Sequence, residues 1–350
     1  MDQQPQTARP ARFSIVRLVQ IALGLALLAF LVVRAVPTWQ GQGDLFALRL
    51  GRLGVPMYGL MLMSGAVAGA LVSEWEARRR SLEVGHVWNI LFWGLILGVT
   101  VSRLWYVAGR LDYFGHDPLA IIGIKGGQFA GLRGLTIHGA LLGAVVAVLL
   151  YAWWQKLNFW TWLDIGTYGF IVGQAVGRWG NFYNQEAYGW RTTLPWGLRI
   201  AAQYRMDAVH RVAGVPYILP EYSKLAPGSP SCAPGLACYT NLALYPETTR
   251  FHPTFLYEFL WNLAMCAFLL WLARRPGQRL LSGEVFFLYG VLTAVGRFGI
   301  EFLRVDSEYV GRFPVAQSVS VGMLVLCGGL LLVRRWRWKK RATGVRRPAE

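Results

Sequence analysis

The stretch FWTWLDIGTYGFIVGQAVGRWGNFYNQEAYG, residues 159–189, joins an apolar run to a cluster of polar side chains. The run ends at Val176 after about the length that a hydrocarbon core requires, and Arg178 follows almost directly. Ionisable groups at membrane depth are costly unless they pair or line a water-filled cavity. The stretch therefore predicts a membrane helix with a functional site at its end. The alternative is a polar helix end that Trp179 and Tyr188 anchor at the membrane interface.

Glycines recur through the polar half of this stretch. Gly177, Gly180 and Gly189 permit close backbone approach and unusual dihedral angles. Non-helical backbone is tolerated at membrane depth where it lines a cavity. We therefore expect a helix that breaks here around an anionic headgroup.

The whole chain has the composition of a membrane protein. Of its 350 residues, 55% are hydrophobic and only 15% are charged. Eight apolar runs approach the length of about 20 residues that a spanning helix needs. They cover residues 14–36, 55–72, 86–107, 136–154, 159–176, 254–272, 283–303 and 315–333. The sequence predicts an all-α integral membrane protein, a polytopic bundle of about eight transmembrane helices.

The formal charge of +17 is distributed as a membrane topology predicts. Basic residues follow the second, sixth and eighth runs, at 78–80, 274–279 and 334–347. With eight spans, these clusters and the N-terminal tail share one face, which the positive-inside rule makes cytoplasmic. We expect both termini in the cytoplasm, the last cluster against anionic lipid headgroups, and no nucleic-acid partner.

Composition divides the chain into three parts. Residues 1–53 hold a tail, a first helix that is not cleaved as a signal peptide, and a connector. Residues 54–333 form the transmembrane core. A loop at 192–249, rich in Pro, Gly, Ser and Tyr, leaves this core as an extracytoplasmic arm. Residues 334–350 form a basic cytoplasmic tail.

The four cysteines indicate no metal site. Cys266 and Cys327 lie inside apolar runs. Cys232 and Cys238 lie in the long loop, where they either form a disulfide or remain two thiols.

Polar residues also stand inside or at the ends of other runs. Tyr58 lies near the start of the second run, and His138 lies at the start of the fourth. Arg297 and Glu301 are spaced i, i+4 in the seventh run, so one helix face presents both and they can pair. Each of these positions also has a structural interpretation. Tyr58 can be an interface anchor, His138 a structural histidine, and Arg297 with Glu301 an internal salt bridge.

Three arginines can surround a phosphate. Arg178, Arg297 and Arg304 each offer a planar fork of donors that matches phosphate oxygens, although no spacing rule requires them to converge. His252 and Glu258 open the sixth run, either as site residues or as interfacial caps.

Taken together, these residues resemble the prolipoprotein diacylglyceryl transferase family, integral membrane enzymes that attach a diacylglyceryl group to bacterial lipoprotein precursors. The strongest element, at 177–189, matches Gly-Arg-x-Gly-Asn-Phe, an aliphatic residue, then Asn-x-Glu-x-x-Gly. Residues 58–60, 137–139, 252–258 and 297–301 lie in the family's order. Two departures are Tyr183, where the family usually has an aliphatic residue, and Ala140, where a second glycine is common.

The resemblance implies a fold and a reaction. The fold is a seven-helix core, in which the first run is either the family's own first helix or an additional span. The reaction moves a diacylglyceryl group from phosphatidylglycerol to the lipobox cysteine of a prolipoprotein signal peptide and releases glycerol phosphate. It takes place in the bacterial inner membrane, in a site toward the extracytoplasmic side, and needs no metal or soluble cofactor.

The same resemblance assigns roles to residues. Arg178 and Arg297 are the candidates for stabilising the departing phosphate. His138 either accepts the thiol proton or binds the headgroup. The candidate substrate-binding residues are Tyr58, Asn181, Asn184, Glu186, Gly189 and Glu301.

Other functions are compatible with the same residues. A transporter or channel for an anionic solute can use Arg178, Arg297 and His138 as a binding ring. A catalytically silent homologue that binds lipid or lipoprotein, or a different lipid-headgroup transferase, is also open.

Overall fold

The computed structural model describes residues 15–50, 53–125, 128–129, 137–205, 211–212, 215–216, 239, 242–243, 245–275, 280–307, 309–310 and 313–344. Eight helices of at least 18 residues dominate this described part. They are α1 (Ile15–Trp39), α2 (Met57–Arg79), α3 (Gly85–Ala108), α5 (Ile137–Trp154), α6 (Phe159–Tyr183), α7 (Thr254–Arg274), α8 (Glu284–Glu301) and α9 (Val315–Gly344). Each overlaps one predicted apolar run, so the predicted helical bundle is confirmed.

The apolar character of these helices supports a membrane location. Among the described residues, α2, α3, α7 and α9 are long and apolar enough to cross a membrane by length and composition. Their outward faces carry large exposed apolar side chains, including Leu62 on α2, Phe92 on α3 and Val325 on α9. Such faces are stable against lipid rather than water.

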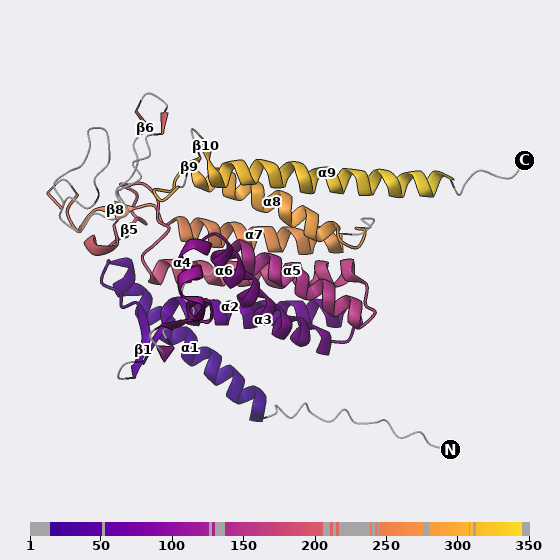
Figure 1. Cartoon of the computed structure of the whole chain (residues 1–350), viewed down its shortest axis with the longest axis horizontal. Coiled ribbons are helices and arrows are strands. Elements are labelled where there is room, and N and C mark those ends of the chain that lie inside the picture. The colour runs from indigo at the N-terminus through magenta and orange to yellow at the C-terminus, as the bar shows by residue number, and fades with distance from the viewer. Residues whose placement is uncertain are drawn as a thin grey trace, which may run out of the picture.

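Short elements surround one end of the bundle. The described part contains five two-stranded antiparallel pairs. They pair β1 (Phe46–Leu50) with β2 (Leu53–Pro56), β3 (Ile124–Lys125) with β4 (Gln128–Phe129), β5 (Leu198–Arg199) with β8 (Arg250–Phe251), β6 (Arg211–Val212) with β7 (Val215–Pro216), and β9 (Tyr309–Val310) with β10 (Phe313–Pro314). Figure 1 shows most of these strands gathered at one end of the long helices, which we call the arm end.

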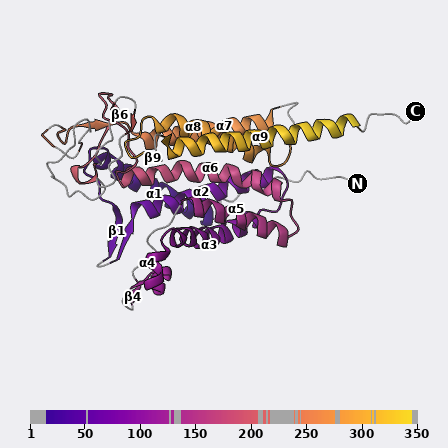
Figure 2. The same ribbon diagram turned by 45° about the horizontal axis from the view of Figure 1, so that its top comes forward.

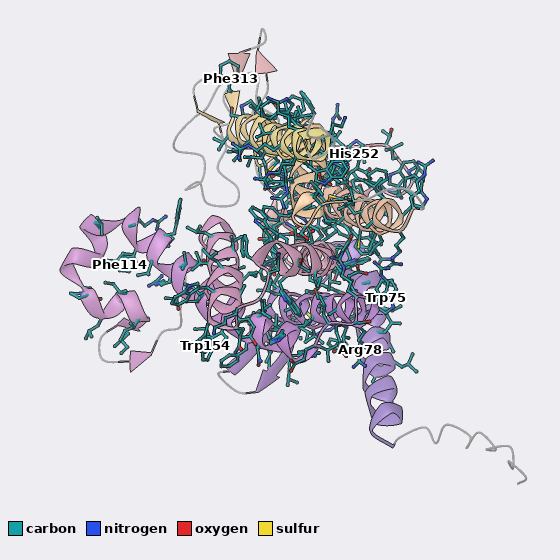
Figure 3. All side chains as sticks on the ribbon, turned by 90° about the vertical axis from the view of Figure 1, so that its right-hand side faces the viewer. Trp75, Arg78, Phe114, Trp154, His252 and Phe313 are labelled. Atoms are coloured by element: carbon teal, nitrogen blue, oxygen red, sulfur yellow. The ribbon has the colours of Figure 1, made fainter. Side chains whose placement is uncertain are left out.

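A smaller excursion leaves the side of the bundle. It contains α4 (Leu111–His116) and a 3₁₀ helix at Pro118–Ile122. Figures 2 and 3 show α4 standing away from the other helices. Arg103, at 8% exposure, holds the excursion by donating to the carbonyl oxygens of Ala120 and Ile121.

The opposite end of the bundle, which we call the basic end, gathers the predicted basic clusters. Arg274 of α7 pairs with Glu76 of α2 at 3.2 Å. Arg335 of α9 pairs with Glu284 of α8 at 2.5 Å. The described residues of the three clusters therefore share one end of the bundle, as the sequence predicts.

Glycines let α2 and α6 pack closely. A Cβ on Gly65 would lie 2.8 Å from the carbonyl oxygen of Gly173, and Gly69 meets Gly169 in the same way. Small residues four apart permit such backbone contact between membrane helices. This contact fixes the start of α2 beside the end of α6.

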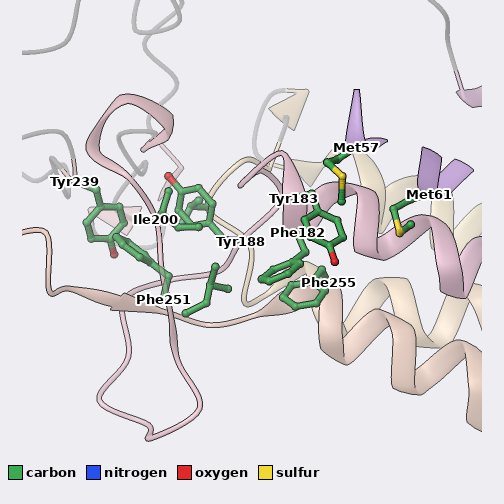
Figure 4. Packing of buried hydrophobic residues seen from close by; sticks show 11 residues of the cluster. Met57, Met61, Phe182, Tyr183, Tyr188, Ile200, Tyr239, Phe251 and Phe255 are labelled. Atoms are coloured by element: carbon green, nitrogen blue, oxygen red, sulfur yellow. The ribbon is translucent and has the colours of Figure 1, made fainter. Parts of the chain in front are cut away.

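An aromatic cluster fixes the ends of α6 and α7 under the arm. Figure 4 shows Phe182 and Phe255 face to face, with ring centroids 4.7 Å apart. Tyr188 and Tyr239 each approach Phe251 edge-on, with centroids 5.0 Å apart. All five rings are at most 2% exposed. The polar motif therefore leaves α6 from a tightly packed base.

Two helices end later than the sequence suggests. The glycines at 177, 180 and 189 predict a helix that breaks in this stretch, but α6 continues through the first two and ends at Tyr183. At membrane depth a continuous helix satisfies its own backbone hydrogen bonds, which outweighs the low helix propensity of glycine. Helix α9 likewise runs to Gly344, past Val333, where the last predicted apolar run ends.

Candidate active site

A strained turn follows α6 and begins the site. Gln185 and Ala187 adopt positive φ values of 53° and 55°, a left-handed conformation that costs non-glycine residues about 1–3 kcal/mol each. The turn is held from outside. The Gln185 side-chain oxygen accepts the N–H of Ala201 at 2.8 Å, and the hydroxyl of Thr254 donates to the Ala187 carbonyl. Backbone strain held in this way is typical of functional sites.

Gly189 joins three segments that are distant in sequence. Its N–H donates to the His252 carbonyl at 2.9 Å, and the N–H of Trp190 donates to the Leu303 carbonyl at 2.9 Å. A Cβ on Gly189 would lie 2.5 Å from the Leu303 oxygen and 2.8 Å from the His252 Cβ. Only glycine fits here. The contact brings the end of α8 and the start of α7 to the end of α6.

Glu258 is the centre of the resulting charge cluster. This buried α7 carboxylate, whose side chain is 5% exposed, pairs with Arg178 of α6 at 2.8 Å. It also pairs with Arg297 of α8 at 2.9 Å and lies 3.5 Å from Arg304 just beyond α8. The three predicted arginines therefore converge, and a carboxylate holds them together.

Two further acids orient two of these arginines. Arg297 pairs with Glu301 at 2.8 Å, which confirms the pair expected from their i, i+4 spacing. Arg304 donates through two nitrogens to Asp306, at 2.8 and 2.5 Å. Burial lowers the pKa of Arg304, but the hydrogen bonds to Asp306 and the nearby carboxylates raise it on balance, so Arg304 stays cationic.

Arg178 differs from its two neighbours. Within the described part of the chain its one acid partner is Glu258, whose carboxylate lies 2.8 Å from its Nη1, whereas Arg297 and Arg304 each have two. A guanidinium carries five N–H donors, so most donors of Arg178 are available. Its side chain is 25% exposed, which leaves it accessible to a ligand.

A second polar group lies beside Arg178. The side-chain amides of Asn181 and Asn184 donate to the exposed carboxylate of Glu186, at 2.8 and 3.4 Å. Asn181 follows Arg178 by three residues on α6, so both project from one helix face. These contacts use the amide nitrogens and do not involve the amide oxygens, which are hydrogen-bond acceptors.

Tyr58 packs across the end of α6. A Cβ on Gly180 would lie 2.8 Å from the Tyr58 ring, so the glycine makes room for it. Tyr58 is 38% exposed and stands on the second residue of α2. The structure thus places Tyr58 next to the polar motif.

Some predicted residues fall outside the described side chains. His138 lies in the first turn of α5, which begins at Ile137, but its side chain is not described. Cys232 and Cys238 also lie outside the described residues. Cys266 and Cys327 are buried free thiols within α7 and α9.

Glu258 is more central to the site than its position in the sequence suggests. The sequence places it near His252, but His252 contacts the Tyr257 hydroxyl at 3.0 Å, and burial lowers the pKa of its ring. A carboxylate four residues inside the apolar run from Thr254 was the available signal, because such a group needs cationic partners.

Comparison with known proteins agrees with the motif. Residues 45–333 match the sequence model of the family described as prolipoprotein diacylglyceryl transferase. A phosphatidylglycerol-prolipoprotein diacylglyceryl transferase of Chloroflexus aggregans is 37% identical, over 84% of this chain and 91% of the relative. Relatives of the same name from Synechococcus elongatus and Bacillus cytotoxicus are 34% and 31% identical, over 86% and 84% of this chain and 90% and 93% of their own lengths. This chain belongs to the prolipoprotein diacylglyceryl transferase family and is a helical, multi-pass membrane enzyme of the transferase class.

Proposed function

We propose that this protein moves a diacylglyceryl group from phosphatidylglycerol to the lipobox cysteine of a prolipoprotein. The names of the relatives give both substrates. One observation supports the chemistry: Arg178, Arg297 and Arg304 converge on Glu258 at the arm end. An ionic cluster of this kind, at the end of membrane helices, suits a lipid phosphate.

The reaction needs positive charge at the leaving group. The cysteine sulfur forms a bond to the glycerol carbon while that carbon's bond to the phosphate oxygen breaks. The electron pair leaves with the oxygen, so the departing glycerol phosphate goes from monoanion toward dianion. Preorganised donors aimed at this charge lower the barrier.

Arg178 and Arg297 supply these donors in the proposed mechanism. Arg178 offers its unused nitrogens directly to the phosphate. Glu301 and Glu258 hold Arg297 from two sides, at 2.8 and 2.9 Å, so its guanidinium is already oriented when substrate arrives. Glu258 is a positioning residue that keeps the arginines together.

The amide group beside Arg178 suits the rest of the headgroup. Asn181, Asn184 and Glu186 present amide and carboxylate oxygens that accept hydrogen bonds from glycerol hydroxyls. Tyr58 borders the same space. Gly189 acts indirectly, because it lets the three segments meet.

His138 has one of two roles in this mechanism. It either accepts the thiol proton or binds the headgroup. A free imidazole has a pKa of about 6.5 and a free thiol a pKa of about 8.5, so the imidazole removes the thiol proton only in part. His138→Gln tests the first role, since full turnover in that variant would exclude an obligatory base.

The membrane arrangement follows from the two ends of the bundle. All eight long helices cross the bilayer, with the basic end in the cytoplasm and the arm end outside. Residues 1–53, 54–333 and 334–350 are the N-terminal unit, the catalytic core with its arm at 192–249, and the basic C-terminal segment. A Cβ on Gly177 would meet nothing within 4 Å, which leaves open space beside Arg178 for lipid arriving laterally from the bilayer.

The direct test uses purified protein, phosphatidylglycerol and a lipobox peptide. Mass spectrometry should detect a diacylglyceryl mass increase on the peptide cysteine, and the increase should vanish with Arg178→Ala. Arg78→Gln is the matched control, because it removes a basic charge at the other end of the bundle. Lipid binding without product would contradict the transferase and favour a binding protein, and solute flux without product would favour a transporter.

A further inference from the structure

A second polar cavity lies at the basic end of the bundle. Its volume is about 430 Å³, within the usual range for small-ligand sites, and α2, α6, α7, α8 and α9 all contribute to its walls. Asp164 on its wall precedes Arg178 by fourteen residues of α6, about 21 Å along the helix axis. Figure 2 shows α6 running the length of the bundle between the two ends. The cavity is therefore separate from the candidate active site.

Arg80 gives this cavity available hydrogen-bond donors. Its Nε donates to Glu76 at 2.8 Å, and among the described residues neither of its terminal nitrogens donates a hydrogen bond. The side chain is only 24% exposed. A guanidinium has five N–H donors, so a partly buried Arg80 with one donor used favours an anionic ligand. Arg79, which also pairs with Glu76, lines the same wall.

The acids near the cavity are already satisfied. Asp164, at 2% exposure, accepts the N–H groups of Gly283 and Phe286 at 2.6 and 3.1 Å. Glu76 is fully buried and is shared by three arginines, of which Arg274 is the third. The carboxylates around the cavity therefore already have hydrogen-bond or ion-pair partners, and the arginines outnumber them.

The cavity also borders a membrane interface. Trp338 of α9 lines it, and α9 carries further basic residues at this end, listed as Arg334, Arg335, Arg337, Lys339, Lys340 and Arg341. Tryptophan is enriched at membrane interfaces, and clusters of basic residues beside a membrane helix attract anionic lipids. A ligand held here is thus more readily supplied by the bilayer than by solution.

We propose that this cavity binds the phosphate headgroup of an anionic membrane phospholipid, with Arg80 as the main donor and Trp338 against the glycerol region. The site is additional to the one around Glu258 and does not depend on the proposed reaction. Its role is binding, which anchors α2, α6 and α9 to the lipid surface at the basic end.

Native mass spectrometry of the full-length protein in nonionic detergent tests the site. Bound phosphatidylglycerol is titrated for the wild type, Arg80→Gln and the control Arg78→Gln. The control removes the same charge two residues earlier, at the end of α2, but Arg78 pairs with Glu74 and does not line the cavity. Trp338→Ala is a second test variant. It breaks no ion pair, so it still tests the site if Arg80→Gln fails to fold.

The expected result is a loss of one class of bound lipid. Arg80→Gln should weaken the affinity for this lipid about tenfold, because charge-assisted hydrogen bonds are lost. Trp338→Ala should weaken the affinity less. Arg78→Gln should match the wild type. An added Arg178→Ala should not change this loss, since the two sites are far apart.

Three results would overturn the proposal. Equal lipid binding in Arg80→Gln and Arg78→Gln would show that Arg80 does not bind the lipid. Displacement by phosphatidylcholine as effective as by phosphatidylglycerol would exclude recognition of an anionic headgroup. Complete displacement by millimolar inorganic phosphate would identify a soluble phosphate, rather than a lipid, as the ligand.

Discussion

Each end of the helix bundle buries one glutamate among three arginines, but the two clusters are assembled differently. Glu258 and Glu76 are 5% and 0% exposed at the side chain. Their partners are Arg178, Arg297 and Arg304 at the arm end, and Arg79, Arg80 and Arg274 at the basic end. At the basic end Arg79 lies on the same helix as the glutamate, and Arg80 directly follows that helix. At the arm end every partner comes from another element.

This difference separates a local charge cluster from one that depends on the whole fold. The Glu76 pairs with Arg79 and Arg80 need only one helix. The Glu258 cluster forms only when α6, α7 and α8 meet, and the tight contact at Gly189 is what brings them together. We therefore expect substitutions at the arm end to act on catalysis, and substitutions at the basic end to act on stability or lipid binding.

The largest expected difference is between Arg178→Ala and Arg79→Ala. Loss of a donor to the developing phosphate charge should lower the turnover of Arg178→Ala by about 10²–10³-fold. Arg79→Ala should keep wild-type turnover, because Arg79 lies at the opposite end. Initial rates of peptide lipidation measure both. A wild-type rate for Arg178→Ala would show that Arg178 has no catalytic role.

The two glutamates give the next comparison. Glu76→Gln should cost about 1–3 kcal/mol of unfolding free energy, less than a fully buried pair because its arginines reach solvent. Glu258→Gln should lose comparable stability and also lower turnover by about tenfold, because the arginines are no longer held in position. Thermal unfolding in detergent and the lipidation rate well below the melting temperature separate the effects. A catalytic loss confined to Glu76→Gln would reverse the assignment of the two ends.

Two glycines of the motif test the packing at the arm end. Gly189→Ala should lower stability by about 1–3 kcal/mol through overpacking against Leu303 and His252. Gly177→Ala meets no atom within 4 Å, so stability should stay the same or rise by up to about 1 kcal/mol from helix propensity. Melting temperatures of the two variants check this. Equal destabilisation would mean that Gly189 is not the close contact that joins the segments.

Local patterns in the sequence predicted much of this protein. The lengths of the apolar runs predicted the positions of all eight long helices, because a membrane helix requires about 20 consecutive, mostly apolar residues. The Arg297–Glu301 pair was predictable because four residues make one helical turn. The motif at residues 177–189 also indicated where the polar site lies.

Non-local contacts were not predictable in the same way. Nothing in the spacing of Arg178, Glu258 and Arg304 requires them to meet, since their contact depends on how three segments pack. The glycines of α6 also do not predict where this helix ends, because in a membrane the backbone's need for hydrogen bonds outweighs the low helix propensity of glycine. The strained conformations of Gln185 and Ala187 have no signature in residue type.

The smallest expected effect concerns His252, which contributes the carbonyl that binds Gly189. Burial lowers the pKa of its ring below the ordinary value of about 6.5, so the folded site favours the neutral form. As the pH falls below about 6.5, the unfolded chain binds the proton first and the native state loses stability. Above that pH both states are neutral, and the ring adds no pH dependence.

Melting temperatures of the wild type and His252→Asn should therefore keep a constant difference above about pH 7 and change in favour of the variant toward about pH 5.5. Tyr257→Phe is the control, because it removes the hydroxyl that contacts the ring and keeps the titrating group. Its pH dependence should follow the wild type. A difference between wild type and His252→Asn that stays constant down to pH 5.5 would mean that the ring takes its proton in the folded state as readily as in water. The arm end would then accept another positive charge beside its arginines, and the contrast with the basic end would rest on geometry alone.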